Sequence, residues 1–197
     1  MADAAPKGAT YADLEAVSPL LVAEIIHGAL VTHPRPSPRH AVAANGLGGE
    51  ITSGYQHGRG GPGGWVFMVE PELHLGSNVV VPDIAGWRRE QLPTLPKNAY
   101  LETPPDWVCE VLAPDTEAFV RITKRPLYAQ AGIESLWLLN PDELYLVTFQ
   151  LAGESWRWQD FICRADEVKI PPFDAAPFSL GVLWPFDEPI DTSKPPA

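Results

Sequence analysis

The sequence has little cysteine, few basic residues and no long apolar run. Its two cysteines, Cys109 and Cys163, stand far apart with no CxxC spacing, so a zinc site is not expected. Cys109 lies in an apolar segment, which favours two buried, reduced thiols over a disulfide. No segment approaches the roughly 20 apolar residues of a membrane span. Residues 1–7 also lack the basic-then-apolar layout of a signal peptide, so a cytoplasmic protein is the simplest expectation.

Basic residues are outnumbered, with 14 Lys and Arg against 25 Asp and Glu and a formal net charge of −11. A protein that grips DNA by its phosphates usually carries a basic surface, so this balance argues against strong nonspecific nucleic-acid binding. A local basic patch or a bound metal could still offset it. One acid-free basic cluster stands on a Pro-rich loop before a predicted helix N-terminus, where a phosphate could dock: His33, Arg35, Arg39 and His40. The alternative is a solvated loop without a ligand.

What the chain does contain is enough apolar sequence for one folded domain. Its 197 residues are 45% hydrophobic and 20% charged, which is typical of a globular protein with a sizeable core. We predict a short disordered lead at residues 1–9, a domain at 10–186 and a loose tail at 187–197. Nucleophile-elbow, HExxH and dinucleotide-binding motifs are absent from the sequence, so serine hydrolases, zincins and Rossmann enzymes have no support.

Local patterns predict mixed helices and strands. Thr10 is expected to cap a short helix that ends by Pro19, and Ser37 to cap a helix over residues 38–53. Gly132 is a C-cap for a later helix that runs to residue 131. Strand-like segments are expected at residues 23–31 (two short strands about a turn at His27-Gly28), 65–69, 79–87, 107–112 and 133–139, followed by a hairpin of 144–151 with 155–163.

Two acidic residues fall in or beside strand-like runs. Asp83 follows Val79-Val80-Val81-Pro82, and Glu110 lies within an apolar run at residues 107–112. An ionised carboxylate is costly to bury unless it is paired or binds a cation, and two on neighbouring strands can share one hard cation. A lysine nearby can stabilise charge that develops on an attacked phosphate, and Lys124 follows Glu110 by 14 residues. This set indicates a metal-dependent phosphodiesterase of the PD-(D/E)xK kind, unless both strand ends simply reach solvent.

The position of Lys124 depends on Pro126. Proline is tolerated in the first turn of a helix but costs about 3 kcal/mol in the interior. We therefore expect the helix to begin near Thr123, with Lys124 in its first turn and held there by an acidic neighbour. The alternative is an earlier helix kinked at Pro126, with Lys124 exposed to solvent.

Together these segments resemble the Uma2 family, bacterial proteins regarded as endonucleases of the restriction-endonuclease-like fold. The resemblance runs over roughly residues 10–185, with matching stretches in order at 23–31, 36–40, 81–84, 107–114, 124–133 and 136–141. It implies an α/β fold with a mixed central β-sheet flanked by helices. It also implies a site built from Glu24, Asp83, Glu110 and Lys124.

The resemblance implies a role for each of these residues. Asp83 and Glu110 would bind Mg²⁺ or Mn²⁺, and Glu24 would complete or orient the metal shell. Lys124 would polarise the attacking water or stabilise the phosphorane charge. The implied activity is hydrolysis of phosphodiester bonds in DNA, with Arg35, Arg39 and His40 as possible phosphate contacts. A homodimer is expected by analogy with other nucleases of this fold, and no membrane partner is expected.

Two departures from the family pattern keep a second class open. A strict ExK motif would place the lysine two residues after Glu110, where this chain has Leu112, so Lys124 must arrive from the next helix. The family usually has an Asp four residues before this lysine, where this chain has Val120, although the neighbouring Arg121 matches. A noncatalytic binding or assembly module on the same fold is therefore the alternative.

Overall fold

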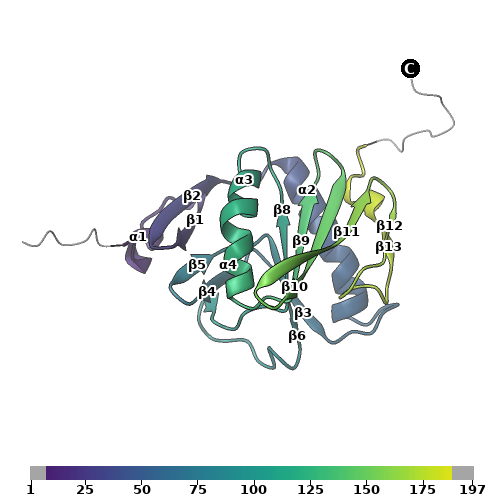
Figure 1. Ribbon diagram of the computed structural model, residues 1–197, viewed down its shortest axis with the longest axis horizontal. Helices are drawn as coiled ribbons and strands as arrows, with labels where there is room; N and C mark the ends of the chain where they lie inside the picture. Colours follow the sequence, from purple (N-terminus) through teal and green to yellow (C-terminus); the bar gives the residue numbers. More distant parts are fainter. Residues whose placement is uncertain (1–7, 188–197) are drawn as a thin grey trace, which may run out of the picture.

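A computed structural model of the protein describes residues 8–187 as a mixed α/β fold with two main β-sheets (Figure 1). The six-stranded sheet has the order β11-β10-β9-β8-β6-β3, and the five-stranded sheet has the order β2-β1-β5-β4-β7. The strands of the larger sheet are β3 (Trp65–Val69), β6 (Ile84–Arg88), β8 (Trp107–Val111), β9 (Ser135–Asn140), β10 (Tyr145–Ala152) and β11 (Ser155–Cys163). Those of the smaller sheet are β1 (Leu21–Ile26), β2 (Ala29–Pro34), β4 (Glu72–Leu75), β5 (Asn78–Val80) and β7 (Tyr100–Leu101). A further pair joins β12 (Glu167–Val168) to β13 (Phe178–Ser179).

The helices are α1 (Tyr11–Glu15), α2 (Pro38–Ile51), α3 (Glu117–Phe119) and α4 (Arg125–Gln130), with π-helical turns at Thr52–Gln56 and Val120–Lys124 and a 3₁₀ turn at Leu180–Leu183. Helices α2 and α4 flank the larger sheet, whereas the short α1 lies beside β1 of the smaller sheet (Figure 1). In the part of the chain that the structure describes, no helix is both long and apolar enough to cross a membrane. The predicted arrangement of a mixed sheet flanked by helices is confirmed.

Successive side chains of β8 point alternately into two hydrophobic cores, one on each face of the sheet. Cys109 and Val111 belong to the cluster that includes side chains of α2, whereas Val108 and Leu112 belong to the cluster that includes those of α4. Successive side chains of a strand point to opposite faces, so Glu110 shares the α4 face. The strand therefore directs a buried carboxylate at the helix that carries Lys124.

The N-terminal elements form as predicted. Thr10 caps α1 through a reciprocal capping box with Asp13, and the helix ends well before Pro19. Strands β1 and β2 pair antiparallel about His27 and Gly28, which both adopt positive φ. Two left-handed residues in a two-residue loop match the twist of the flanking strands, and this connection fixes the register of the hairpin.

Helix α2 also begins where the sequence places it. The Ser37 side chain accepts a hydrogen bond from the His40 N–H, and Pro38 occupies the first turn. A Cβ on Gly46 would lie 3.1 Å from Leu183 Cδ2, so glycine permits the close approach of the C-terminal turn. The start of α2 is therefore fixed by a cap, and its middle by close packing.

The predicted strand over residues 79–87 is wrong. The structure divides it into β5 and β6, which belong to different sheets, with Val81–Asp83 crossing between them. Pro82 has no N–H to donate to a strand ladder, which explains the break. Asp83 therefore lies in the crossing between the sheets rather than within a strand.

The predicted helix start near Thr123 is also wrong. Residues 117–130 are continuously helical, with a π-helical turn at Val120–Lys124 closed by Arg125 N–H donating to the Val120 carbonyl. The wider turn comes immediately before Pro126, whose ring would clash with a carbonyl of a regular α-helical turn. The earlier-helix alternative therefore holds, but Lys124 is buried rather than exposed.

The predictions for the two cysteines and for the chain ends are confirmed only in part or lie partly outside the described residues. Cys109 is buried and reduced as expected, whereas Cys163 is a free thiol that is only partly buried, at the end of β11. Of the predicted disordered lead, residues 1–7 lie outside the described residues, and Ala9 donates its N–H to the Gly28 carbonyl. Of the predicted loose tail, residues 188–197 lie outside the described residues, and Asp187 forms an ion pair with Arg39.

Candidate functional site

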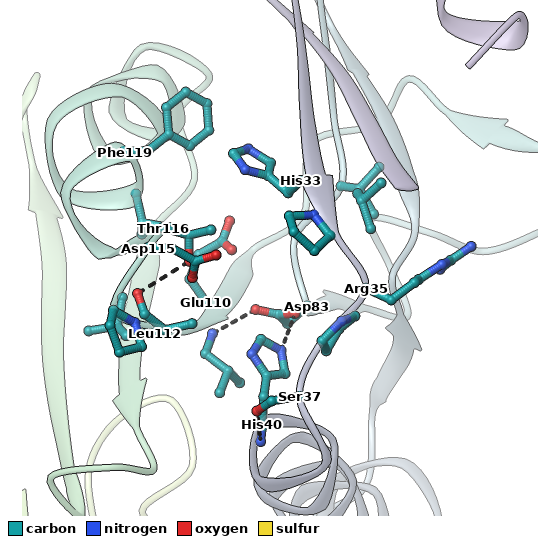
Figure 2. A pocket seen from close by; sticks show the side chains of 18 of the residues that line it. His33, Arg35, Ser37, His40, Asp83, Glu110, Leu112, Asp115, Thr116 and Phe119 are labelled. Carbon is teal, nitrogen blue, oxygen red and sulfur yellow. Dashed lines mark hydrogen bonds and ion pairs between the residues drawn. The ribbon is translucent and has the colours of Figure 1, made fainter. Parts of the chain in front are cut away.

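All four predicted site residues line one cavity of about 450 Å³. Glu24 comes from β1, Asp83 from the crossing between the sheets, Glu110 from β8 and Lys124 from the π-helical turn. Figure 2 shows the cavity wall, with Asp83 and Glu110 close to one another and Phe119 and His33 toward its other end. Residues far apart in the sequence thus form one acidic pocket.

Lys124 is the centre of the buried charges. Its ammonium lies 2.7 Å from Glu110 Oε1, 3.0 Å from Glu24 Oε1 and 3.1 Å from the Val81 carbonyl oxygen. An ammonium has three donors, so each of them has a partner here. Burial by itself would lower the pKa of Lys124, but the two carboxylates outweigh it and raise the pKa. The lysine is therefore cationic although only 4% exposed.

Glu110 is the most perturbed carboxylate of the cavity. Its Oε1 accepts hydrogen bonds from both Lys124 and the Tyr128 hydroxyl. Burial, aided by the negative charges of Asp83 and Glu24, raises the pKa of Glu110 to about 7 against the opposing charge of Lys124. Within the described chain both contacts fall on Oε1, so Oε2 is the oxygen available to a ligand.

Glu24 holds the lysine from the hairpin side. Its Oε1 also accepts the Val81 N–H at 2.8 Å, and its Oε2 lies 3.7 Å from His33 Nε2. The same main-chain residue therefore donates to Glu24 through its N–H and accepts from Lys124 through its carbonyl. This arrangement joins β1, the crossing between the sheets and the π-helical turn.

Asp83 is held by two donors from two further elements. Its Oδ2 accepts the Val111 N–H at 2.7 Å, and its Oδ1 lies 2.7 Å from His40 Nε2 (Figure 2). Burial by itself would lower the pKa of His40, but the hydrogen bond to Asp83 and the negative charges of Asp83, Glu110 and Glu70 together outweigh it and raise the pKa. The carboxylate is thus fixed at the cavity wall while its other lone pairs remain open.

The two arginines of the predicted basic cluster are each paired with an acidic residue. Arg35 contacts Glu70 and the Pro19 carbonyl, and in Figure 2 it points away from Asp83. Arg39 binds Asp187. Arg35 lines the cavity and stays a candidate phosphate contact, whereas Arg39 is not among the residues that line it. The sequence conceals these pairs because the acids come from distant segments.

The two residues that depart from the family pattern, Leu112 and Val120, are both buried. Leu112 is 1% exposed within the core on the α4 side of the sheet. The ammonium of Lys124 instead reaches Glu110 from the π-helical turn. Val120 is buried and lines the cavity, so an apolar side chain occupies the place where the family usually carries Asp.

Tyr128 is a site residue that the sequence analysis missed. Its ring is fully buried, and its hydroxyl donates to Glu110. Tyr128 follows Lys124 by four residues, which places the two side chains on one face of a helix. That spacing was visible in the sequence and could have identified it.

The oxygen donors fit a hard divalent cation. Across residues 8–187, no three Asp, Glu, His or Cys side chains are grouped as a complete metal site. Mg²⁺, however, is commonly bound through one or two carboxylates together with waters and substrate phosphate oxygens. Asp83 has two lone pairs left after its two hydrogen bonds, and Glu110 has Oε2. Asp83 and Glu110 would therefore hold the ion.

Comparisons with known proteins give a family match and a similar solved structure. The Uma2 family model, described as "Putative restriction endonuclease", matches residues 9–181. No match is found among the curated proteins. A similar solved structure is that of "a putative nuclease belonging to DUF820" from Anabaena variabilis ATCC 29413. The two chains share 23% identity with a TM-score of 0.63, over 82% of this chain and 89% of that one.

At this identity the structural likeness shows the fold alone, and it confirms the predicted restriction-endonuclease-like α/β fold. The family match is the stronger finding because it spans nearly the whole described chain. The protein therefore belongs to the Uma2 family.

Proposed function

We propose that the protein is a divalent-metal-dependent endonuclease of the PD-(D/E)xK type that hydrolyses phosphodiester bonds in DNA. The observation that carries the proposal is the buried Lys124 ammonium, bonded to two carboxylates in a cavity that Asp83 also lines. Perturbed ionisable groups gathered in one cavity are typical of catalytic sites. Membership in a family described as restriction endonucleases supports the same reaction.

The protein's own residues would divide the work. Asp83 and Glu110 would hold Mg²⁺ or Mn²⁺, which supplies charge neutralisation at the scissile phosphate and lowers the pKa of water. Glu24 and the Val81 carbonyl orient Lys124, so the ammonium is fixed before substrate arrives. Lys124 would then stabilise negative charge that develops on the phosphoryl oxygens.

The saturated lysine imposes a requirement on this mechanism. All three Lys124 donors already have protein partners, so contact with a phosphate requires one to be released. A cation bound by Glu110 would weaken its hold on the ammonium, because the carboxylate would share its charge. Cation binding and release of the lysine are thereby linked in the proposal.

A second candidate is a noncatalytic binding module on the same fold. The cavity is lined by six acidic residues, Glu24, Glu70, Asp83, Glu110, Asp115 and Asp142, but by only one arginine and one lysine, Arg35 and Lys124, with the two histidines His33 and His40. Such a surface repels a DNA backbone unless cations intervene. A saturated buried ion cluster could also serve stability alone.

Calorimetric titration of Mg²⁺ and Mn²⁺ would separate the two candidates. Wild type is compared with Asp83→Ala and with the control Asp160→Ala, which removes an exposed carboxylate outside the cavity. Each protein is also incubated with supercoiled plasmid and the same ion. The nuclease predicts that binding and nicking are lost together in Asp83→Ala and kept in Asp160→Ala. Absence of wild-type binding at millimolar ion would favour the noncatalytic module.

A further inference from the structure

His40 lies at a fixed place beside the proposed site. It occupies the first turn of α2, where its N–H is held by the Ser37 side chain at 3.3 Å and Pro38 restrains the backbone. Its own side chain is 11% exposed, and Nε2 lies 2.7 Å from Asp83 Oδ1 (Figure 2). The imidazole is thus delivered to the carboxylate by a capped helix N-terminus.

Asp83 depends on such support because it lies outside regular secondary structure. The crossing between β5 and β6 carries the residue, and its carbonyl accepts the Glu70 N–H at 2.9 Å, so the backbone is held but the carboxylate needs partners of its own. The Val111 N–H restrains Oδ2, and His40 is the side chain that restrains Oδ1. One donor on each oxygen stops rotation of the carboxylate about its last bond.

The direction of the hydrogen bond follows from the chemistry of the acceptor. An ionised carboxylate only accepts, so Nε2 of His40 carries the proton and donates it. Each oxygen of an ionised carboxylate has two acceptor sites, and His40 takes one of the two on Oδ1. Because the two donors fix the orientation of the carboxylate, they also fix the direction of the acceptor site that remains on each oxygen.

We propose that His40 is a positioning residue that orients Asp83 for binding the divalent ion, an inference that rests on the proposed nuclease function. Partners that hydrogen-bond metal-binding carboxylates typically alter metal affinity or activity by about 10- to 100-fold when removed. The occupied Nε2 also explains why His40 serves Asp83 rather than a substrate phosphate. His40 acts through Asp83 and needs no contact with the reacting atoms.

Three substitutions test the role. His40→Gln keeps an N–H donor at a similar reach, whereas His40→Leu and His40→Phe remove the donor and keep an apolar group of different size. Calorimetry with Mn²⁺ should show about 10- to 100-fold weaker binding for Leu and Phe and nearly wild-type binding for Gln. With plasmid at saturating Mn²⁺, the turnover rate should fall in the same two variants while KM for plasmid stays unchanged.

A measurement on the unaltered protein covers the case in which the apolar variants do not fold. Nitrogen-15 NMR of the histidine side chains should show His40 with a slowly exchanging proton on Nε2. An unprotonated Nε2, or wild-type Mn²⁺ affinity in folded His40→Leu, would overturn the inference alone. Failure of wild type to bind Mn²⁺ would instead overturn the proposed function, and the inference with it.

Discussion

Two charged clusters each place one base between two acids, but they differ in how much of each cluster is buried. In the cavity cluster, one Lys124 ammonium lies between two carboxylates, Glu24 and Glu110. In a second cluster, one Arg88 guanidinium lies between Asp106 and Glu134. Each therefore has two acids for one base.

Burial separates the two clusters. The side chains of the cavity cluster are all less than 6% exposed. In the second cluster Asp106 is 5% exposed, but Arg88 and Glu134 are 35% and 52% exposed. Water screens the excess negative charge of the second cluster. In the cavity cluster the excess remains inside the protein, and Asp83 adds to it. The comparison shows that the cavity cluster, unlike the Arg88 cluster, keeps uncompensated negative charge away from water, which is typical of catalytic sites.

Removing each cation should break the two clusters unequally. Lys124→Met leaves two buried carboxylates without their partner, which should lower the free energy of unfolding by about 3–5 kcal/mol. Arg88→Met leaves Glu134 in water and the buried Asp106 still bonded to the N–H of residue 88, so it should cost less, about 1–2 kcal/mol. Urea unfolding at pH 7 measures both. Equal losses in the two variants would show that the cavity is an ordinary ion cluster.

Neutralising one acid in each cluster should separate activity from stability. Glu110→Gln removes a proposed ion-binding oxygen and should reduce plasmid nicking by at least about 100-fold. It should leave the free energy of unfolding unchanged or higher, because the carboxylate already resists ionisation. Glu134→Gln is the control and should nick normally. Full activity in Glu110→Gln would contradict its proposed role.

The raised pKa of Glu110 should make the free energy of unfolding depend on pH. The pKa of Glu110 is raised from 4.5 to about 7, so between these values the folded state binds more protons than the unfolded state. Its contribution therefore lowers the free energy of unfolding as pH rises through this window. Urea unfolding in EDTA from pH 4.5 to 8 should show this decline in wild type and Asp106→Asn but lose it in Glu110→Gln.

Exposed pairs outside both clusters should matter least. Arg35 lines the cavity beside Glu70, whereas Arg39 is bound to Asp187. Arg35→Ala should raise KM for plasmid by roughly tenfold or less and reduce its dependence on salt, because one phosphate contact is lost. Arg39→Ala should leave KM unchanged. A larger effect of Arg39→Ala would mean that the Arg39 pair opens to meet the substrate.

Local signals were sufficient for several elements. The Thr10 and Ser37 caps and the His27-Gly28 turn form as their residue types predict. These features depend on neighbours within a few residues, so their geometry can be read directly from the chain. The strand over 79–87 failed because its apolar run hides a proline at which the chain changes sheets.

The cavity residues were only partly predictable. A carboxylate in an apolar run and a lysine before a proline identified Glu110 and Lys124 as unusual, and the resemblance added Glu24. The resemblance could not reveal that Lys124 is buried with all its donors used, or that His40 donates to Asp83. Partners of this kind come from segments 14 to 100 residues apart along the chain.

The sequence by itself determined the residue types that carry the chemistry, the ends of the capped helix and the turn of the first hairpin. Only the tertiary structure decided that two acids share one ammonium and that the basic loop is neutralised. The reason is physical: caps and turns are set by contacts between near neighbours, whereas burial and charge pairing depend on which distant segments pack together.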